Sequence, residues 1–272
     1  MQASSIDRFF GLKLVINLER RRDRWQGMQD RLQTVGLSAE RFLATDGSAA
    51  EFQAEYERYT GTPRQSVSFW RRIRTRPGFV FSRDHQARLA YLDHRRKTRA
   101  AATAGAWACL HSMRRALHHA LDSGQSTCLL LEDDCVFHHD ANEIFAEVIQ
   151  QVPHDWYILQ LGTMQWHWWY IRPYSENLYC NRGLSIGAHA VGYSQQAIED
   201  ALELLEWGDA TYDEGVLSTL TGLHPTRCFV IRPNLAVQAG DDSDIGSSAH
   251  TSRKRMARRW RRFRWRPEDY SV

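Results

Sequence analysis

The chain has 272 residues, of which 43% are hydrophobic and 25% charged, a composition that suits a globular protein with a sizeable core and excludes a disordered chain. No apolar run approaches the roughly 18 residues of a membrane-spanning helix, and we expect no signal peptide. The five cysteines are odd in number and show no CxxC spacing, so we expect a protein of the reduced cytoplasm.

The first 47 residues predict a strand, a helix and a second strand. The run LKLVINL at 12–18 is almost continuously apolar, which is typical of a buried strand. Apolar residues then recur every three or four positions, as one helix face would require, at Trp25, Met28, Leu32 and Val35. Gly36 favours a helix end, and RFLATDG at 41–47 predicts a second strand. This order predicts a βαβ unit with parallel strands.

Residues 48–103 show no strong hydrophobic period, because arginine and aromatic residues alternate in stretches such as FWRRIRTRPGF. A segment of this length without a clear element is uncommon inside a compact domain. We therefore predict a variable insertion or a lid.

From residue 104 onward, helical and strand patterns alternate. Helices are predicted at 104–124, 141–152 and 194–207, and Ser194 is the expected N-cap of the last one. Strands are predicted at 127–131, 155–162, 185–194 and 228–231. The alternation predicts an α/β fold with a mostly parallel, Rossmann-like sheet flanked by helices.

Three consecutive carboxylates, Glu132, Asp133 and Asp134, directly follow the buried strand at 127–131. In open parallel sheets, ligands bind beyond the carboxyl ends of the strands. Adjacent acids near a core stay ionised only when a cation or hydrogen-bond donors compensate their charge. Strand alternation directs Glu132 and Asp134 to one side, where Mn²⁺ or Mg²⁺ could bind and in turn hold a diphosphate. The alternative is a solvated loop or a helix cap.

Four segments resemble glycosyltransferase family 25, the bacterial lipopolysaccharide-type enzymes related to the collagen galactosyltransferases. They are VINLERRRDRW with RFLATDG, then GAWACLHSMRRALHHALDSGQSTCLLLEDDCVF, then GAHAVGYSQQAIEDALELL with YDEGV, and finally RPNLAVQAGDDSDI. Together they span about residues 12–247, without 48–103 and the Trp-rich stretch. The chain departs from the family where Ser112-Met113 replaces its usual Ser-His, and His111 would point elsewhere on the helix.

The resemblance implies a GT-A-type single domain over 1–252, followed by a basic, aromatic tail at 253–272. It also implies inverting transfer of a hexose, usually galactose, from a UDP-sugar to a saccharide or glycolipid acceptor, in lipopolysaccharide or other cell-surface glycan synthesis. The metal, Mn²⁺ or Mg²⁺, would be held by Glu132, Asp134 and His250. Arginine suits the diphosphate because its planar fork donates two hydrogen bonds. The donor-binding residues would be Asn17, Leu18, Arg20, Arg24, Asp133, Ser243 and Asp244.

Inversion in one displacement needs a base that takes the proton of the acceptor hydroxyl. The acidic turn TYDEG offers Asp213, which we favour because it falls where the family has its acidic residue, and Glu214. The alternative is that both acids complement a helix dipole.

The Trp-rich stretch at 164–170 predicts an acceptor platform, since sugars stack on indole rings. Its candidates are Trp166, Trp168 and Trp169. Ordinary packing under a loop, or a dimer contact, is the alternative.

The tail at 253–267 has nine basic residues and no acidic one, interleaved with Trp260, Phe263 and Trp265. We expect it to bind the inner face of the cytoplasmic membrane, with its aromatic rings in the interface, and we expect no nucleic acid partner. A solvated, disordered end is the alternative. Three other functions stay open: a nucleic-acid-binding protein acting through the tail, a metal-dependent phosphoester hydrolase, and a sugar-nucleotide binder without catalysis.

Overall fold

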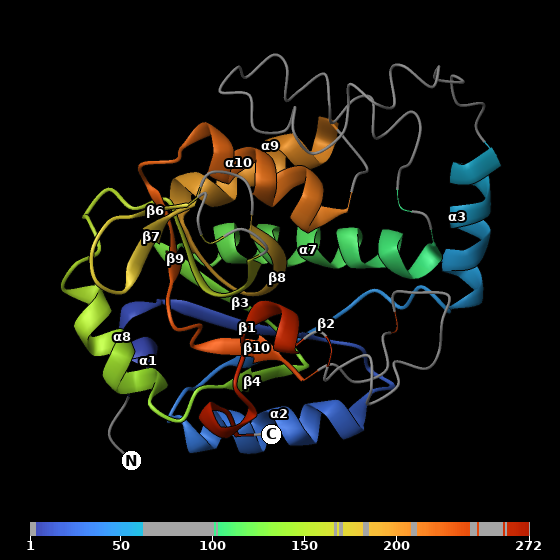
Figure 1. The fold of residues 1–272 in the computed structure, drawn as a ribbon. Helices are drawn as coiled ribbons and strands as arrows, with labels where there is room; N and C mark the ends of the chain where they lie inside the picture. Colours follow the sequence, from blue (N-terminus) through green and yellow to red (C-terminus); the bar gives the residue numbers. More distant parts are fainter. Residues whose placement is uncertain are drawn as a thin grey trace.

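A computed structural model describes residues 4–61, 101, 103–165, 168, 171–181, 185–207, 211–239, 244, 258 and 260–271, without the side chains of Ile186, Trp207 and Glu214. A central sheet lies between two layers of helices (Figure 1). One face carries α7 (Ala104–Asp122), α9 (Gln195–Trp207) and α10 (Ser218–Leu223), and the other carries α1 (Ser5–Phe9), α2 (Arg22–Thr34) and α8 (Ala141–Ile149). The predicted α/β fold is confirmed. None of the described helices combines the length and apolar character that crossing a bilayer requires.

The sheet has eight strands in the order β2–β1–β3–β8–β5–β9–β7–β6. Their bounds are β1 (Leu12–Asn17), β2 (Glu40–Leu43), β3 (Thr127–Glu132), β5 (Ile158–Gln165), β6 (Arg172–Pro173), β7 (Leu178–Cys180), β8 (Ser185–Ser194) and β9 (Cys228–Ile231). β1 pairs in parallel with β2 and β3, which confirms the predicted βαβ unit, and β5 pairs in parallel with β9.

The sheet is mixed because β8 runs antiparallel to both of its neighbours, β3 and β5. Gln165 at the end of β5 pairs with Ser185 at the start of β8, so these two strands form a wide hairpin. An antiparallel pair needs no crossover helix. The antiparallel strands β6 and β7 lie within the connection between them and extend the edge of the sheet next to β9.

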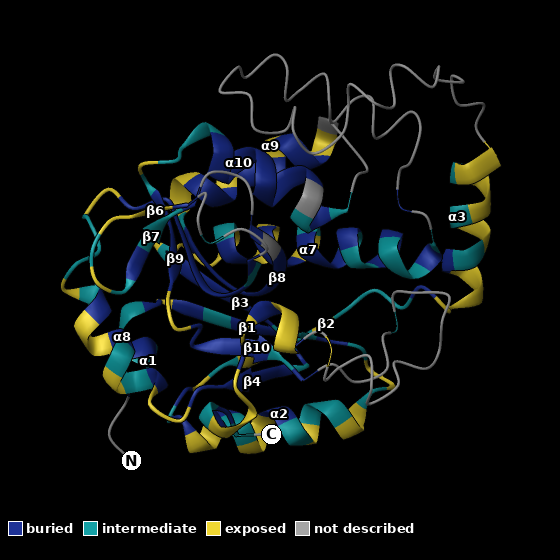
Figure 2. Ribbon diagram, viewed as in Figure 1, coloured by how far each residue is buried: buried dark blue, intermediate teal, exposed yellow. Residues whose placement is uncertain are grey.

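Burial on both faces explains the continuous apolar run of β3. Cys128 and Leu130 join the core under α7 and α9, whereas Leu129 and Leu131 join the core over α1, α2 and α8. Figure 2 shows buried residues along the central strands of the sheet and exposed residues on the outer faces of the helices. A sheet covered on both faces needs apolar residues at every strand position, not only at alternate ones.

Local sequence signals set the helix ends. Thr103 Oγ1 accepts a hydrogen bond from Ala106 N at 3.1 Å at the start of α7. Gly124 follows α7 with a φ of +67°, a conformation in which glycine has no Cβ clash. Ser194 Oγ accepts from Ala197 N at 3.3 Å, so the predicted N-cap of α9 is confirmed.

Part of the predicted insertion at 48–103 is a helix, α3 (Ala50–Gly61). Its aromatic residues pack on α7, where the Tyr59 and Trp107 rings stack with centroids 4.7 Å apart. His111 turns toward this cluster, and its ring lies 4.4 Å from that of Trp107. Met113 instead lies in the main core, as the helical spacing predicts. Residues 62–100 and 102 lie outside the described part of the chain.

A second, two-stranded sheet pairs β4 (Cys135–Phe137) antiparallel with β10 (Ala236–Gln238). The C-terminal segment, residues 260–271, packs on it and contains the short helix η2 (Pro267–Asp269). Trp260, Phe263 and Trp265 are only 5–6% exposed, so the prediction that their rings dip into a membrane is wrong. The rings complete a small core with Val136 and Val237, where the hydrophobic effect favours them.

The arginines of the same segment lie on the opposite side, toward solvent. The exposed ones are Arg261, Arg262, Arg264 and Arg266; together with the exposed Arg258 just before the segment, we call them the arginine face. The segment is thus two-sided, with aromatic residues inward and cationic residues outward.

Candidate active site

The acidic turn, Glu132 to Asp134, lies where β3 ends and the chain turns into β4. On one side it is held by β10. Gln238 Nε2 donates to Glu132 Oε2 at 2.8 Å, and Ala239 N donates to the carbonyl oxygen of Asp134 at 2.8 Å. The turn therefore has a fixed backbone and an oriented glutamate.

The charges of this turn are only partly compensated by the described residues. Burial and the negative charge of Asp134 raise the pKa of Glu132 to about 8, and Asp213 and Asp133 add to this shift. The hydrogen bond from Gln238 acts in the opposite direction. Ionised Glu132 is therefore unfavourable at neutral pH unless a cation joins it.

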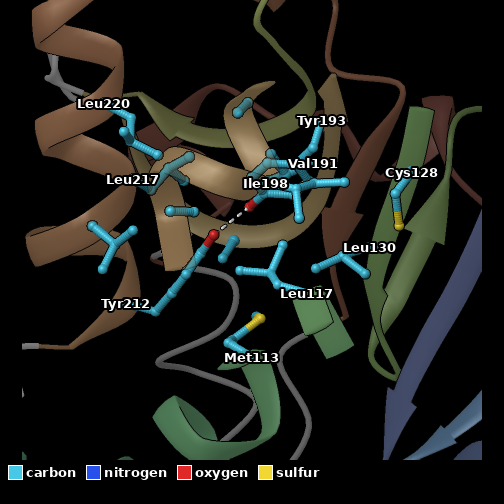
Figure 3. Close-up of a cluster of buried hydrophobic side chains, with 14 of the residues drawn as sticks. Met113, Leu117, Cys128, Leu130, Val191, Tyr193, Ile198, Tyr212, Leu217 and Leu220 are labelled. Atoms are coloured by element: carbon cyan, nitrogen blue, oxygen red, sulfur yellow. Dashed lines mark hydrogen bonds between the residues drawn. The ribbon is translucent and has the colours of Figure 1, made fainter. Parts of the chain in front are cut away.

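The π-helical turn η1 (Asp213–Leu217) brings Asp213 close enough to influence this site. Tyr212, the residue before it, points into the core, and its hydroxyl donates to Tyr193 Oη at 3.0 Å (Figure 3). The negative charges of Glu132 and Asp213 add to burial in raising the pKa of Cys109 on α7 to about 12. The core thus anchors the segment that carries Asp213.

Asp133 faces away from Glu132, toward β1 and α2, as strand alternation predicts. Asn17 Nδ2 donates to Asp133 Oδ2 at 2.6 Å, and Arg24 Nη1 lies 3.1 Å from Asp133 Oδ1. Asn17 is only 1% exposed, and its Oδ1 accepts from Arg41 Nε at 2.8 Å. Arg41 also donates to the carbonyl oxygen of Leu18 at 3.2 Å. Asn17 and Asp133 therefore tie the ends of β1 and β3 to α2.

Three arginines at the start of α2, Arg20, Arg21 and Arg24, form what we call the arginine cluster. The Asp244 carboxylate lies 2.8 Å from Arg20 Nη2, 2.7 Å from Arg21 Nη1 and 3.7 Å from Arg24 Nη1. Asp46 adds an ion pair with Arg20 at 2.9 Å. The structure thus brings together Arg20, Arg24, Asp133 and Asp244, four of the residues predicted to bind the donor.

Asp46 also belongs to this site, although it is not among the residues predicted to bind the donor. It follows β2, whose parallel pairing with β1 brings its carboxyl end to the same edge. Ser112 Oγ accepts from Thr45 N at 2.8 Å and so fixes this loop on α7. At Gly47, a Cβ atom would lie 2.8 Å from the carbonyl oxygen of Ala104, which only glycine avoids. The rule for parallel strand ends could have predicted Asp46.

The sequence profile of glycosyltransferase family 25 (LPS biosynthesis protein) matches residues 11–185. The chain belongs to glycosyltransferase family 25. It is a glycosyltransferase of lipopolysaccharide biosynthesis, and the matched range contains the arginine cluster and the acidic turn. No curated protein matches the chain significantly.

The enzyme's described residues include no group of three or more His, Cys, Asp or Glu side chains arranged to hold a metal ion. Mg²⁺ and similar hard cations often need less, because they bind one or two carboxylates together with substrate phosphates and water. Glu132 and Asp134 fit this kind of site, since a cation would relieve the repulsion that raises the pKa of Glu132. His250, Ser243 and the side chain of Glu214 lie outside the described residues.

Trp168 lies on the other half of the glycosyltransferase's sheet. Its ring centroid is 5.5 Å from that of Tyr179 on β7, and the Arg232 guanidinium lies 4.9 Å from it. β3, β5 and β9 point in the same direction, so Trp168 follows a strand that ends at the same edge as Glu132. β3 and β9 are three strand spacings apart in the sheet, so the ends of these two strands lie about 14 Å from each other. Trp166 and Trp169 lie outside the described residues.

Proposed function

We propose that this glycosyltransferase moves a hexose, namely galactose, from a UDP-sugar to a saccharide acceptor, with inversion and with a divalent metal. One observation carries the proposal: an acidic turn, in which burial and neighbouring carboxylates raise the pKa of Glu132, adjoins an arginine cluster at one edge of the sheet. A metal–diphosphate complex needs carboxylates for its cation and guanidinium groups for its phosphates.

The arginine cluster is the proposed diphosphate site. Asp244 now makes two short contacts to it, through Arg20 at 2.8 Å and Arg21 at 2.7 Å. Phosphate oxygens make the same kind of charge-assisted bond to a guanidinium, so a diphosphate replaces the Asp244 carboxylate. Mn²⁺ or Mg²⁺, held by Glu132 and Asp134, would supply positive charge to the leaving diphosphate.

Asp213 is the proposed base. The acceptor oxygen forms a bond to the anomeric carbon while the bond from that carbon to the diphosphate oxygen breaks. Uridine diphosphate leaves with the bonding electrons, and Asp213 takes the proton of the acceptor hydroxyl. Attack from the face opposite the leaving group inverts the anomeric centre. The arginine cluster stabilises the charge that develops on the diphosphate.

The acceptor is proposed to approach along the carboxyl edge of the sheet toward Trp168, whose ring offers a stacking surface. We also propose that the arginine face binds anionic lipid headgroups, because lipopolysaccharide intermediates are lipid-anchored. Its attachment is electrostatic, since the aromatic rings of the segment are buried. Buried rings also argue against single-stranded nucleic acid, which needs exposed aromatic groups for base stacking.

Thermal unfolding in the presence of UDP-hexoses tests the donor and the metal together. UDP-galactose with Mn²⁺ should stabilise the protein by about 2.7 kcal/mol at 100 times its dissociation constant. EDTA should abolish the shift, and so should Glu132→Gln. The matched control is Glu147→Gln on α8, an exposed glutamate that should leave the shift intact. A shift that persists in EDTA would contradict metal dependence, and a larger shift with another UDP-hexose would reassign the donor.

Sedimentation with anionic vesicles tests the arginine face. Replacing Arg262, Arg264 and Arg266 by glutamine should abolish binding, which should also weaken steeply with salt. The control replaces three exposed arginines elsewhere, Arg8, Arg58 and Arg172. Equal loss in both variants would show only a net-charge effect and would refute the proposal. Retained vesicle binding at high salt would do the same.

A further inference from the structure

Two hydrogen bonds connect the C-terminal segment to the acidic turn. Trp260 Nε1 donates to the carbonyl oxygen of Gln238 at 3.2 Å, and Gln238 Nε2 donates to Glu132 Oε2 at 2.8 Å. We infer that Gln238 and Trp260 are positioning residues that orient the Glu132 side chain for metal and donor binding. The inference rests on the proposed function of Glu132.

Gln238 lies beside both ends of the acidic turn. It is the last residue of β10 and lies opposite Cys135, the first residue of β4 after the acidic turn. The next residue, Ala239, donates its N–H to the carbonyl oxygen of Asp134. The backbone thus fixes where the Gln238 side chain starts, and the amide then donates to Glu132.

Trp260 fixes Gln238 from the opposite side. Its side chain is 6% exposed, and its ring lies 6.0 Å from that of Trp265 and 5.7 Å from that of Tyr270. Tyr270 Oη in turn donates to the carbonyl oxygen of Asn234 at 2.9 Å, just before β10. The segment is therefore anchored on the β4–β10 sheet at two places, and Trp260 is the anchor that reaches the residue bonded to Glu132.

This arrangement gives the C-terminal segment a role at the site, independent of any membrane. Groups that hydrogen-bond a metal-binding carboxylate orient it, and their loss typically weakens metal binding by roughly 10–100-fold. Gln238 hydrogen-bonds Glu132 directly, whereas Trp260 acts on Glu132 only through its hydrogen bond to Gln238. We therefore expect a large effect from Gln238 and a smaller one from Trp260.

The test compares two tryptophans of one cluster. Trp260→Phe and Trp265→Phe remove similar volumes from the same small core, but only the first removes the hydrogen bond to Gln238. Mn²⁺ titration of the full chain should show roughly tenfold weaker binding in Gln238→Met and about threefold weaker binding in Trp260→Phe. Trp265→Phe should stay within twofold of the parent protein. The KM for the UDP-sugar should rise in the same order, with the KM for the acceptor unchanged.

Equal effects of Trp260→Phe and Trp265→Phe would reduce the role of Trp260 to packing and would overturn the inference. Unchanged Mn²⁺ affinity in Gln238→Met would overturn it as well. If the parent protein binds no Mn²⁺, the proposed function fails, but the positioning role is still measurable by hydrogen exchange. The N–H of Ala239 should then exchange faster in Trp260→Phe than in Trp265→Phe, and equal rates would refute positioning.

Discussion

The arginine cluster and the acidic turn adjoin each other at one edge of the sheet, yet their charges are balanced differently. Each guanidinium of the cluster has a carboxylate partner within 3.1 Å, supplied by Asp46, Asp133 or Asp244. In the acidic turn, by contrast, burial and neighbouring carboxylates raise the pKa of Glu132 to about 8. The charges of the arginine cluster are balanced without a ligand, whereas a cation would relieve the repulsion within the acidic turn.

The difference indicates how the two halves of a metal–diphosphate ligand would bind. At the arginine cluster, an incoming anion exchanges with a carboxylate that is already present, so charge balance is kept. At the acidic turn, an incoming cation adds positive charge beside Glu132, where the Gln238 amide donates a hydrogen bond but carries no charge. The cluster should therefore contribute most to folding stability and diphosphate binding, and the turn should govern metal dependence.

The largest expected effect is on turnover. Asp213→Asn should lower kcat by roughly 10³-fold, because an amide cannot take the proton of the acceptor hydroxyl. Donor-induced thermal stabilisation should remain, since Asp213 is not assigned to donor binding. Initial rates with saturating donor and acceptor measure the effect, with Glu203→Gln, exposed on α9, as the control. A kcat within tenfold of the parent enzyme would remove Asp213 from the role of base.

Next in size is the effect of Arg24→Met on folding. The ion pair of Arg24 with Asp133 is nearly buried, with side chains 10% and 11% exposed. Replacing Arg24 leaves the buried Asp133 carboxylate without its cationic partner, so the free energy of unfolding should fall by about 3 kcal/mol. Urea denaturation monitored by circular dichroism provides the measurement. If Arg24→Met/Asp133→Asn is no more stable than Arg24→Met alone, the loss does not come from the uncompensated charge.

The raised pKa of Glu132 in the acidic turn predicts that the stability of the protein depends on pH. Folded Glu132 keeps its proton up to a pKa of about 8, whereas the unfolded carboxyl loses it near 4.5. Between these values the folded state binds more protons, so the free energy of unfolding should fall as pH rises, on the order of 1–2 kcal/mol. Urea midpoints in EDTA between pH 5 and 8 measure this slope. Glu132→Gln should flatten it, and identical slopes in both proteins would contradict the raised pKa.

The smallest effect belongs to Arg20→Met. Its side chain is 43% exposed, so its ion pairs with Asp46 and Asp244 are weakened by solvent. The free energy of unfolding should change by less than about 1 kcal/mol. UDP-sugar affinity should still fall by roughly tenfold, since a charge-assisted bond to phosphate is lost. Unchanged UDP-sugar affinity, measured by calorimetry, would exclude Arg20 from the diphosphate site.

Several parts of the site could be predicted because they follow from local pattern. The apolar runs of β1 and β3 predicted buried strands, and the parallel βαβ unit brought Arg20, Arg24 and the acidic turn to one edge. Gln238 was not predicted because β10 pairs with β4 in a separate small sheet, and no hydrophobic periodicity in the sequence predicts that pairing. The tail was misread for a related reason: alternating aromatic and basic residues suit a membrane surface as well as a small core.

The sequence by itself determined the α/β fold, the family and the edge of the sheet that carries the charged residues, because strand and helix periods and short ordered segments are local properties. Only the tertiary structure decided that β8 runs antiparallel and that Asp133 turns to Asn17 and Arg24. It also decided that Trp260 reaches Gln238 from the far end of the chain. These pairings join residues distant in sequence, and which partner lies closest depends on how the whole core packs.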